Sequence, residues 1–363
     1  MKSSAIKYAK KACATMMAKF DAADLPPKGN FHYHQGVFLS GMMNTFDVCK
    51  EEKYLNYIKE WVDSIIIDDG TIRRFAKSTL DDYMAGILLF PLYDHFKEQK
   101  YITALHLFAG NIHNWLRNQK GGFWHMERFP EQMWLDGLYM VGPLQAMYAK
   151  KFDVPRSLND AIEQVYIMYE NMQDSETKLL YHAWHCAYET PLVEWADKET
   201  GLSSEFWGRA MGWYVVAILN ILEQMPEEHP EYAKLCSIEH EVLTALLKYQ
   251  DDKTGMWYQV IDKVDRPDNW VETSCSCLFV YALAKAIRMG IIDRKYLTQV
   301  EKGFNGIIQN SVTVENNSLF LSKVCVGTGV CDYQGYIERP TSTNDLHGMG
   351  AFLLMCAELG RLD

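Results

Sequence analysis

The sequence predicts an all-α protein in which six inner and six outer helices alternate and close into an (α/α)6 barrel. Two observations support this fold. Apolar residues recur with helical periodicity along almost the whole chain, and the alternation typical of strands is nearly absent. Every second predicted helix is apolar over most of its surface, as a helix buried on all sides must be. An open helical solenoid is the alternative, but no repeat of fixed period recurs.

The helical pattern divides into twelve segments of two kinds. They are residues 3–19, 36–49, 52–66, 83–98, 100–117, 137–151, 156–171, 206–224, 230–248, 273–288, 294–309 and 346–360. The even-numbered segments are the apolar ones, and we expect them to form the inner ring. The odd-numbered segments carry charge on one face and are expected to form the outer layer.

The composition limits the possible partners. The chain has 363 residues and is expected to form one domain, residues 1–363, because no linker rich in Pro, Gly or Ser divides it. A net charge of −11 without a basic block argues against nucleic acid. Lysines interrupt the apolar residues of the N-terminus, and no apolar run is long enough to span a membrane, so neither a signal peptide nor membrane contact is expected. Nothing in the sequence specifies an oligomeric state.

The cysteines give no sign of a metal site. Nine of them are scattered without a CxxC pair, and neither close pair has histidines nearby at the spacing of a zinc site. We therefore predict no metal and no cofactor. Reduced, mostly buried cysteines in a cytoplasmic protein explain the pattern.

The first candidate for chemistry is Asp136, in the aromatic-rich stretch 121–142. Trp134 and Tyr139 lie beside it in sequence, and His125 precedes it by eleven residues. Apolar walls raise the pKa of a carboxyl group, and aromatic faces stack on sugar rings. An Asp before an apolar-periodic run is also an ordinary helix N-cap. Both interpretations remain open.

The starts of the inner helices supply the other candidates. If the even-numbered helices are inner, their N-termini meet at one end of the barrel, where free N–H groups favour a carboxylate ligand. The residues expected there are Tyr33, Asp81, Asp136, Trp207, Arg209 and Trp213. Asp81 as a simple cap, and Arg209 as a surface partner of Glu205 four residues earlier, are the alternatives.

Two long irregular stretches, residues 172–205 and 310–345, lead into inner helices. Loops of such length are usually functional or disordered. Tyr181, Trp184, Tyr188 and Trp195 in the first stretch indicate an ordered loop that covers a pocket. His182 lies in this stretch, and like His125 it directly follows an aromatic residue.

Several motifs resemble one family over nearly the whole chain. They are YHQGVFLSGM (33–42), FPEQMWLDGLYM (129–140), YHAW (181–184), ADKETGLSSEFWGRAMGWY (196–214) and ERPTSTNDLHGMGAFLL (338–354). Together they are similar to the unsaturated rhamnogalacturonyl hydrolases, glycoside hydrolase family 105. One departure is His185, because the family often has an acidic residue there.

The resemblance implies an (α/α)6 barrel that removes a 4,5-unsaturated uronic acid from the non-reducing end of lyase-generated oligosaccharides, without a metal. The residue matching Asp136 protonates C4 of the sugar, water adds at C5, and the hemiketal collapses. Asp81 would orient the water or keep Asp136 protonated. The substrate-binding residues would be Tyr33, His125, His182, Trp207, Arg209 and Trp213. A galacturonyl-rhamnose substrate, pectin breakdown and a cytoplasmic location are further implications.

Other functions fit the same residues. Asp136 and Asp81 are a possible carboxylate pair for a conventional inverting glycosidase. His182 and His125 could serve a sugar epimerase as acid and base, and a non-catalytic sugar-binding protein would need Asp136 only as a cap. The pKa of Asp136 also stays undecided, because a helix N-terminus lowers it whereas burial and Asp81 raise it.

Overall fold

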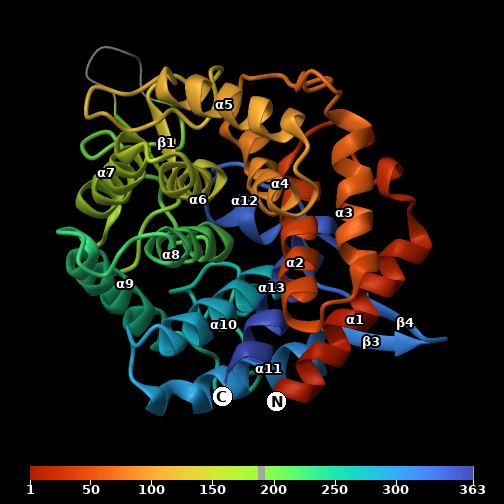
Figure 1. The fold of residues 1–363 in the computed structure, drawn as a ribbon. Coiled ribbons are helices and arrows are strands. Elements are labelled where there is room, and N and C mark those ends of the chain that lie inside the picture. Colours follow the sequence, from red (N-terminus) through yellow and green to blue (C-terminus); the bar gives the residue numbers. More distant parts are fainter. Residues whose placement is uncertain (187–192, 363) are drawn as a thin grey trace.

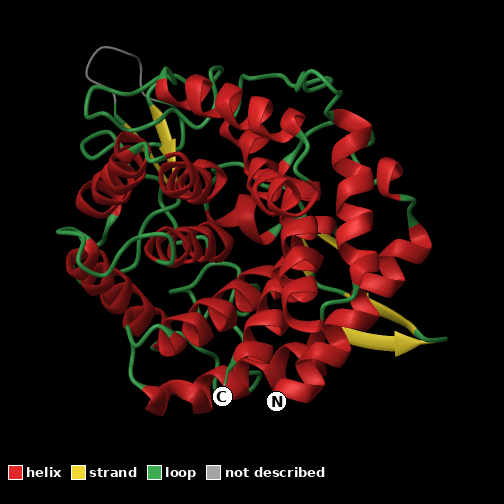
Figure 2. Ribbon diagram, viewed as in Figure 1, coloured by secondary structure: helices red, strands yellow, loops and turns green. Residues whose placement is uncertain are grey.

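A computed structural model describes residues 1–186 and 193–362 of the chain, and helices dominate it (Figure 1 and Figure 2). The α-helices of the described chain are α1 (Lys2–Lys19), α2 (Tyr33–Cys49), α3 (Glu52–Ile65), α4 (Leu89–Phe96), α5 (Gln99–His113), α6 (Leu135–Phe152), α7 (Pro155–Met172), α8 (Gly208–Leu222), α9 (Tyr232–Leu247), α10 (Thr273–Arg288), α11 (Leu297–Ser311), α12 (Tyr333–Ile337) and α13 (Leu346–Arg361). Three short 3-10 helices, η1 (Ala22–Asp24), η2 (Leu80–Leu88) and η3 (Arg294–Tyr296), complete the helical structure.

Six helical segments form a closed inner ring. In order around it, α2 packs on η2, η2 on α6, α6 on α8, α8 on α10, α10 on α13, and α13 back on α2. The helices α1, α3, α5, α7, α9 and α11 pack outside this ring, where α3 and α11 contact mainly one inner helix and the other four contact two. The predicted (α/α)6 barrel and its inner and outer layers are confirmed.

The ring closes where glycines let two helices touch. A Cβ atom added to Gly350 in α13 would lie 2.4 Å from the backbone of Val37 in α2. A Cβ atom on Gly41 would lie 2.7 Å from the carbonyl oxygen of Gly350. Such distances leave no room for a side chain, so the contact between the first and the last inner helix, α2 and α13, depends on these two glycines.

The fourth predicted helix differs most from the structure. Residues 83–98 were expected to form one α-helix, but η2 occupies residues 80–88 and α4 begins only at Leu89. Pro91 lies in the first turn of α4. Proline is tolerated in a first turn but not in a helix interior, where its ring meets the carbonyl of an earlier residue. The α-helix therefore starts just before Pro91.

Short strands are the elements that the helical pattern did not predict. They are β1 (Gln132–Trp134) paired with β2 (Ala183–His185), β3 (Val312–Glu315) with β4 (Ser318–Leu321), and β5 (Val324–Cys325) with β6 (Thr341–Ser342). The β3–β4 hairpin turns at Asn316 and Asn317, whose φ angles are +47° and +66°. Asparagine tolerates positive φ at both positions of a hairpin turn, so this signal was available in the sequence.

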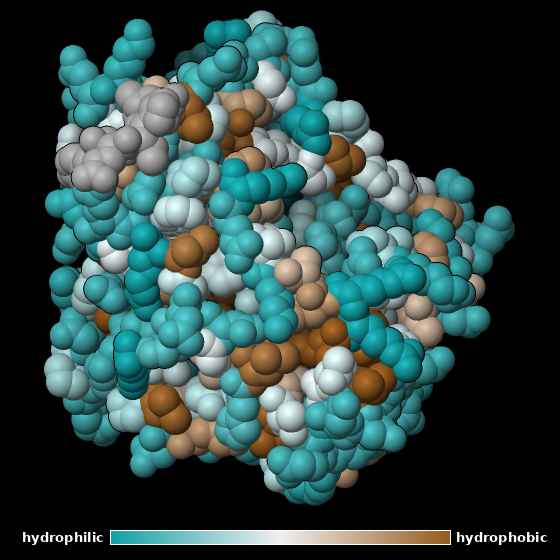
Figure 3. Space-filling view, turned by 90° about the horizontal axis from the view of Figure 1, so that it is seen from above, coloured by the Kyte–Doolittle hydropathy of each residue, from teal (hydrophilic) through white to brown (hydrophobic). Residues whose placement is uncertain are grey.

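The surface fits the acidic composition. Hydrophobic residues reach the face shown in Figure 3 only as patches among hydrophilic ones. Among the described residues, each helix is too short or too polar to traverse a lipid bilayer.

Candidate active site

Asp136 lies in the first turn of the inner helix α6, and the residue is 9% exposed. The N-cap position is Trp134, which makes no capping hydrogen bond with its side chain. The partner of Asp136 is His182, whose Nε2 is 3.1 Å from Oδ2 of the carboxylate. The alternative in which Asp136 serves only as a helix cap is therefore wrong.

A strand pair brings His182 to this carboxylate. In the antiparallel pair β1–β2, Trp134 lies opposite Ala183. The backbone N–H of Leu135 donates to the carbonyl of His182 over 3.0 Å. Because Leu135 and His182 adjoin the paired residues, two side chains from distant parts of the sequence meet at the start of α6.

Asp136 and Tyr336 together fix which ring nitrogen of His182 carries the hydrogen. Its hydroxyl lies 2.6 Å from Nδ1 of His182, and its oxygen accepts from the N–H of Cys331 over 3.4 Å. The Asp136 carboxylate only accepts, so Nε2 of a neutral ring must donate to it, and the Tyr336 hydroxyl supports this tautomer by donating to Nδ1. The hydrogen of a neutral His182 is then on Nε2, where it donates to Asp136. The sequence analysis missed Tyr336, whose only signal was its place in the long stretch 310–345.

The second carboxyl group, Asp81, lies in the first turn of η2 and is also 9% exposed. The capping residue there is Thr79, so Asp81 is not the cap. Oδ1 of Asp81 is 3.6 Å from Nε2 of His125. The His125 ring stacks on Trp134 with 4.4 Å between centroids, and His182 meets Trp134 edge-on at 5.5 Å. Trp134 thus lies between two histidines, each beside a carboxyl group.

The two carboxyl groups have opposite pKa shifts. Burial raises the pKa of Asp81 to about 8, and the charges of Asp136 and Asp82 add to the increase. Burial also acts to raise the pKa of Asp136, but the hydrogen bond from His182 and nearby positive charge outweigh it, so that this pKa falls below its usual value. At neutral pH the free protein therefore holds a proton on Asp81 and a carboxylate at Asp136.

Arg209 donates hydrogen bonds to the protein backbone. The side chain is buried, and its two terminal nitrogens donate to the carbonyls of Cys325 and Val326 over 2.7 Å and 2.9 Å. The guanidinium also lies over the ring of Trp207 at 4.4 Å. Its hydrogen bonds do not go to Glu205, so the surface-pair alternative is wrong. Arg209 holds the strand β5 against the start of α8.

The predicted aromatic residues lie at different depths. Trp207 packs between His182, at 4.6 Å, and Tyr336, at 5.8 Å between ring centroids. Trp213 lies deeper in the barrel and stacks on Tyr139 at 4.5 Å. Tyr33 is partly buried, and Arg209, Asp81 and Asp136 all act on its pKa, so it lies near the pair. Trp207 and Tyr33 therefore lie near Asp136 and Asp81, whereas Trp213 lies deeper in the barrel.

The comparisons with known proteins agree with this geometry. The family model described as Glycosyl Hydrolase Family 88 matches residues 8–363. The chain belongs to this family. It is 26% identical over 331 residues to the unsaturated rhamnogalacturonyl hydrolase YesR of Bacillus subtilis, covering 89% of this chain and 88% of YesR.

The solved structures that resemble this family 88 chain include members of family 105. A Clostridium acetobutylicum glycoside hydrolase from family 105 aligns with a TM-score of 0.92 and 34% identity, covering 98% of this chain and 100% of the other. The unsaturated glucuronyl hydrolase of Bacillus sp. GL1 shares the fold, with a TM-score of 0.75 and 16% identity over 99% and 97% of the two chains. The predicted resemblance is confirmed, and the chain is a glycoside hydrolase. The non-catalytic and epimerase alternatives are therefore wrong.

A cavity of about 700 Å³ in this glycosyl hydrolase opens beside Trp134, the ring that lies between His125 and His182. Trp134, His185, Trp195 and Arg128 are among the residues that line it. The stretch 172–205 thus contributes to a pocket wall through Trp195, as predicted, whereas the predicted Tyr188 lies outside the described residues. Arg128 is exposed, and its charge acts on Asp81. The sequence analysis did not select Arg128.

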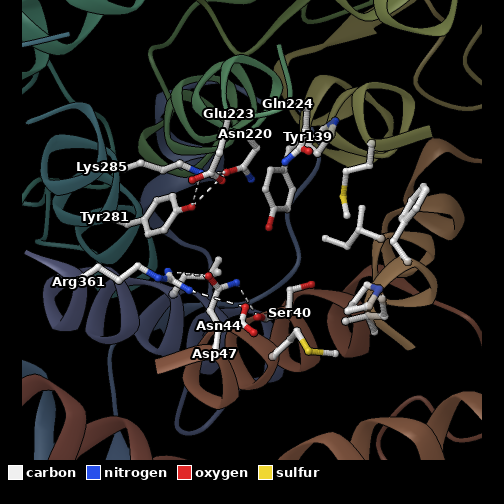
Figure 4. A pocket seen from close by; sticks show the side chains of 18 of the residues that line it. Ser40, Asn44, Asp47, Tyr139, Asn220, Glu223, Gln224, Tyr281, Lys285 and Arg361 are labelled. Carbon is white, nitrogen blue, oxygen red and sulfur yellow. Dashed lines mark hydrogen bonds and ion pairs between the residues drawn. The ribbon is translucent and has the colours of Figure 1, made fainter. Parts of the chain in front are cut away.

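A second cavity, of about 450 Å³, lies at the opposite end of the barrel and is lined by the later turns of the inner helices. Figure 4 shows Lys285 beside Glu223, and Arg361 beside Asn44 and Asp47. The Nζ of Lys285 donates to Glu223 and to Asn220, both over 2.7 Å. Tyr139 lines this cavity and stacks on Trp213, so these two rings separate the two ends of the barrel.

Proposed function

We propose that this glycoside hydrolase removes a 4,5-unsaturated uronic acid from the non-reducing end of short oligosaccharides by hydrating the C4=C5 double bond. The main support is the buried pair Asp136 and Asp81, whose pKa values are shifted in opposite directions. An enol ether needs one acid to protonate carbon, and two neighbouring carboxyl groups that together hold one proton at neutral pH can supply it. The name of YesR, a relative along most of the chain, points to the same substrate class.

In the proposed reaction, substrate binding moves this proton from Asp81 to Asp136. The uronate carboxylate brings negative charge and excludes water, and both effects raise the pKa of Asp136. Asp136 then donates its proton to C4, and positive charge develops at C5, where the ring oxygen stabilises it. Water adds to C5 and returns a proton to Asp136. The resulting hemiketal opens its C5–O bond, and the hemiacetal at C1 releases the following sugar.

We propose roles for the neighbouring side chains from their contacts. His182 orients Asp136 through its Nε2–H, and His125 and Trp134 form a wall against which the sugar ring packs. Arg128, on the cavity wall, is proposed to bind the uronate carboxylate, with Arg209, which uses two of its N–H donors on backbone carbonyls, as a second cation for it. Tyr33 and Trp207 line the pocket, and Trp213 supports it from below.

We also propose a galacturonyl-rhamnose disaccharide from pectin as the substrate, and the cytoplasm as the location. The substrate follows the printed activity of YesR, an unsaturated rhamnogalacturonyl hydrolase. The nine cysteines are all free, which fits a reducing compartment. A single domain over residues 1–363 is proposed to carry the activity, since the family model spans residues 8–363.

One assay tests the reaction. The protein is incubated with a lyase-made unsaturated disaccharide, and the ultraviolet absorbance of the conjugated double bond is followed together with release of the second sugar. We expect the absorbance to fall as the sugar is released. Release with the absorbance unchanged would instead indicate a conventional inverting glycosidase that uses the same two carboxyl groups. The saturated disaccharide is the control substrate, and it should remain intact.

A further inference from the structure

A cluster of potential metal ligands lies where the inner helices α2 and α13 begin. His34 is in the first turn of α2, Asp345 is the N-cap of α13, and His347 follows two residues later. One ligand atom from each residue lies within 4.8 Å of the others. The sequence analysis found no metal-ligand cluster, because His34 is separated from the other two residues by almost the whole chain.

The orientation of His347 makes one nitrogen available. Its Nε2 is 3.0 Å from the carbonyl oxygen of Cys325. A carbonyl only accepts, so Nε2 carries the hydrogen and the lone pair of a neutral His347 is on Nδ1. Histidines that bind metals usually donate their other ring N–H in this way, often to a backbone carbonyl.

Two imidazole nitrogens of the cluster residues are buried without a hydrogen-bond partner. Nδ1 of the fully buried His347 lies 2.7 Å from Oδ1 of Asp345, which is within ion-pair distance, but the two atoms do not have hydrogen-bond geometry. Nε2 of His34 is also buried and unpartnered, and its ring stacks on His347 at 5.2 Å. A buried polar atom without a partner is rare in proteins and calls for an occupant.

We infer that His34, Asp345 and His347 bind one divalent transition-metal ion of the Zn²⁺ or Co²⁺ type. Two imidazole nitrogens and one carboxylate suit such ions, whereas Mg²⁺ and Ca²⁺ prefer oxygen ligands. Two helix N-termini disfavour a cation, but the Asp345 carboxylate caps one of them and offsets its partial charge. Arg209 and Nε2 of His347 both donate to the carbonyl of Cys325. Arg209 therefore lies on the side of the His347 ring opposite Nδ1.

The ion would join the two helices that close the inner ring. It is separate from the proposed reaction, in which Asp136 and Asp81 move the proton. The alternative is a protonated His347 that forms a metal-free ion pair with Asp345. That alternative leaves Nε2 of His34 unpaired, and it predicts no response of the protein to metal ions.

The test uses the full chain after treatment with a chelator, titrated with Co²⁺ alone and followed by visible absorbance and by Tm. The variants are His34→Gln and Asp345→Asn, since Asn preserves helix capping but removes the charge. His95→Gln, in α4 and outside the cluster, is the matched control. Circular dichroism confirms that each variant is folded.

We expect the wild type and His95→Gln to bind about one Co²⁺ per chain with a rise in Tm. Either cluster variant should bind at least about tenfold more weakly. Absence of saturable binding by the wild type would overturn the inference in favour of the ion pair. Unchanged binding by both cluster variants would also overturn it, because the ion would then be held elsewhere, for example by cysteines. Neither result depends on hydrolysis of the sugar.

Discussion

The two ends of the barrel use similar residues in opposite ways. At the end where the inner helices begin, carboxyl groups and histidines are buried with incomplete pairing, and Asp81 retains a proton at neutral pH. At the other end, Lys285 is almost fully buried, but Glu223 and Asn220 accept from it. Both ends have cavities large enough for a small ligand.

The difference shows that the two cavities are distinguished by how completely the charges around them are paired. Charges at the far end neutralise one another, as in the pairs of Glu358 with Arg288 and Arg361. A paired, buried charge has little remaining capacity to move a proton or bind a ligand. Chemistry is expected where burial shifts pKa values and leaves polar atoms without a hydrogen-bond partner. Substitutions at the two ends should therefore affect different measured quantities.

The largest expected effect is that of Asp136→Asn. It removes the proposed acid while keeping the shape of the side chain, and kcat/KM should fall by about three orders of magnitude. Tm should change little, because the amide can still accept from His182. The ultraviolet assay and a thermal melt measure the two effects. Activity near the wild-type level would reject Asp136 as the acid.

At the far end, Glu358→Gln should act on stability instead. The Glu358 side chain is 1% exposed and pairs with the partly exposed Arg288 and Arg361, so the change removes two charge-assisted hydrogen bonds from a buried carboxylate. We expect the free energy of unfolding to fall by about 3 kcal/mol, with kcat/KM of the folded protein unchanged. Urea unfolding checks this, and the exposed Glu301→Gln is the control. A large loss of kcat/KM at unchanged stability would contradict the separation of the two ends.

Arg128→Ala tests how the site recognises a charged substrate. If Arg128 binds the uronate carboxylate, KM should rise by about tenfold, and kcat should change much less. Steady-state kinetics separate the two constants. Lys120→Ala, a substitution of a nearby exposed cation that is not among the cavity-lining residues, is the matched control. An unchanged KM would remove Arg128 from the proposed site.

Tyr336→Phe tests the positioning of His182. Without the hydroxyl, Nδ1 of His182 loses its hydrogen-bond donor and the ring is held less firmly against Asp136, so kcat should fall by about tenfold with a changed pH–rate profile. KM should change less, because Tyr336 is not proposed to contact the substrate. Tyr333→Phe, on the same short helix α12 but bonded to Asp268, should behave like the wild type. If both variants have the same kinetics, Tyr336 has only a packing role.

The smallest expected effect is a pH dependence of stability caused by Asp81. Its pKa is raised to about 8 in the folded protein and is about 3.9 in an unfolded chain. Between these values only the folded state holds the proton, so its contribution to stability falls as pH rises. Between pH 6 and pH 7 this contribution to the free energy of unfolding should fall by about 1 kcal/mol. Urea unfolding at both values should show a smaller decline for Asp81→Asn than for the wild type.

Local sequence was sufficient for most of the helices. The residues 273–288 were predicted to form a helix and do so as α10, because an unbroken apolar run followed by a turn specifies such an element. The division of 83–98 into η2 and α4 was missed, although Pro91 indicated it. The predicted roles of Asp136 and Asp81 remain predictions until the kinetics are measured.

Sequence periodicity determined the alternation of buried and amphipathic helices, and with it the barrel and the end at which polar side chains gather. Only the tertiary structure decided which carboxyl group holds the proton, because burial and the hydrogen bond from His182 depend on packing between distant segments. The same holds for Tyr336 behind His182, and for the grouping of His34 with Asp345 and His347. Hydrogen bonds and desolvation act over a few ångströms in space, whatever the separation along the chain.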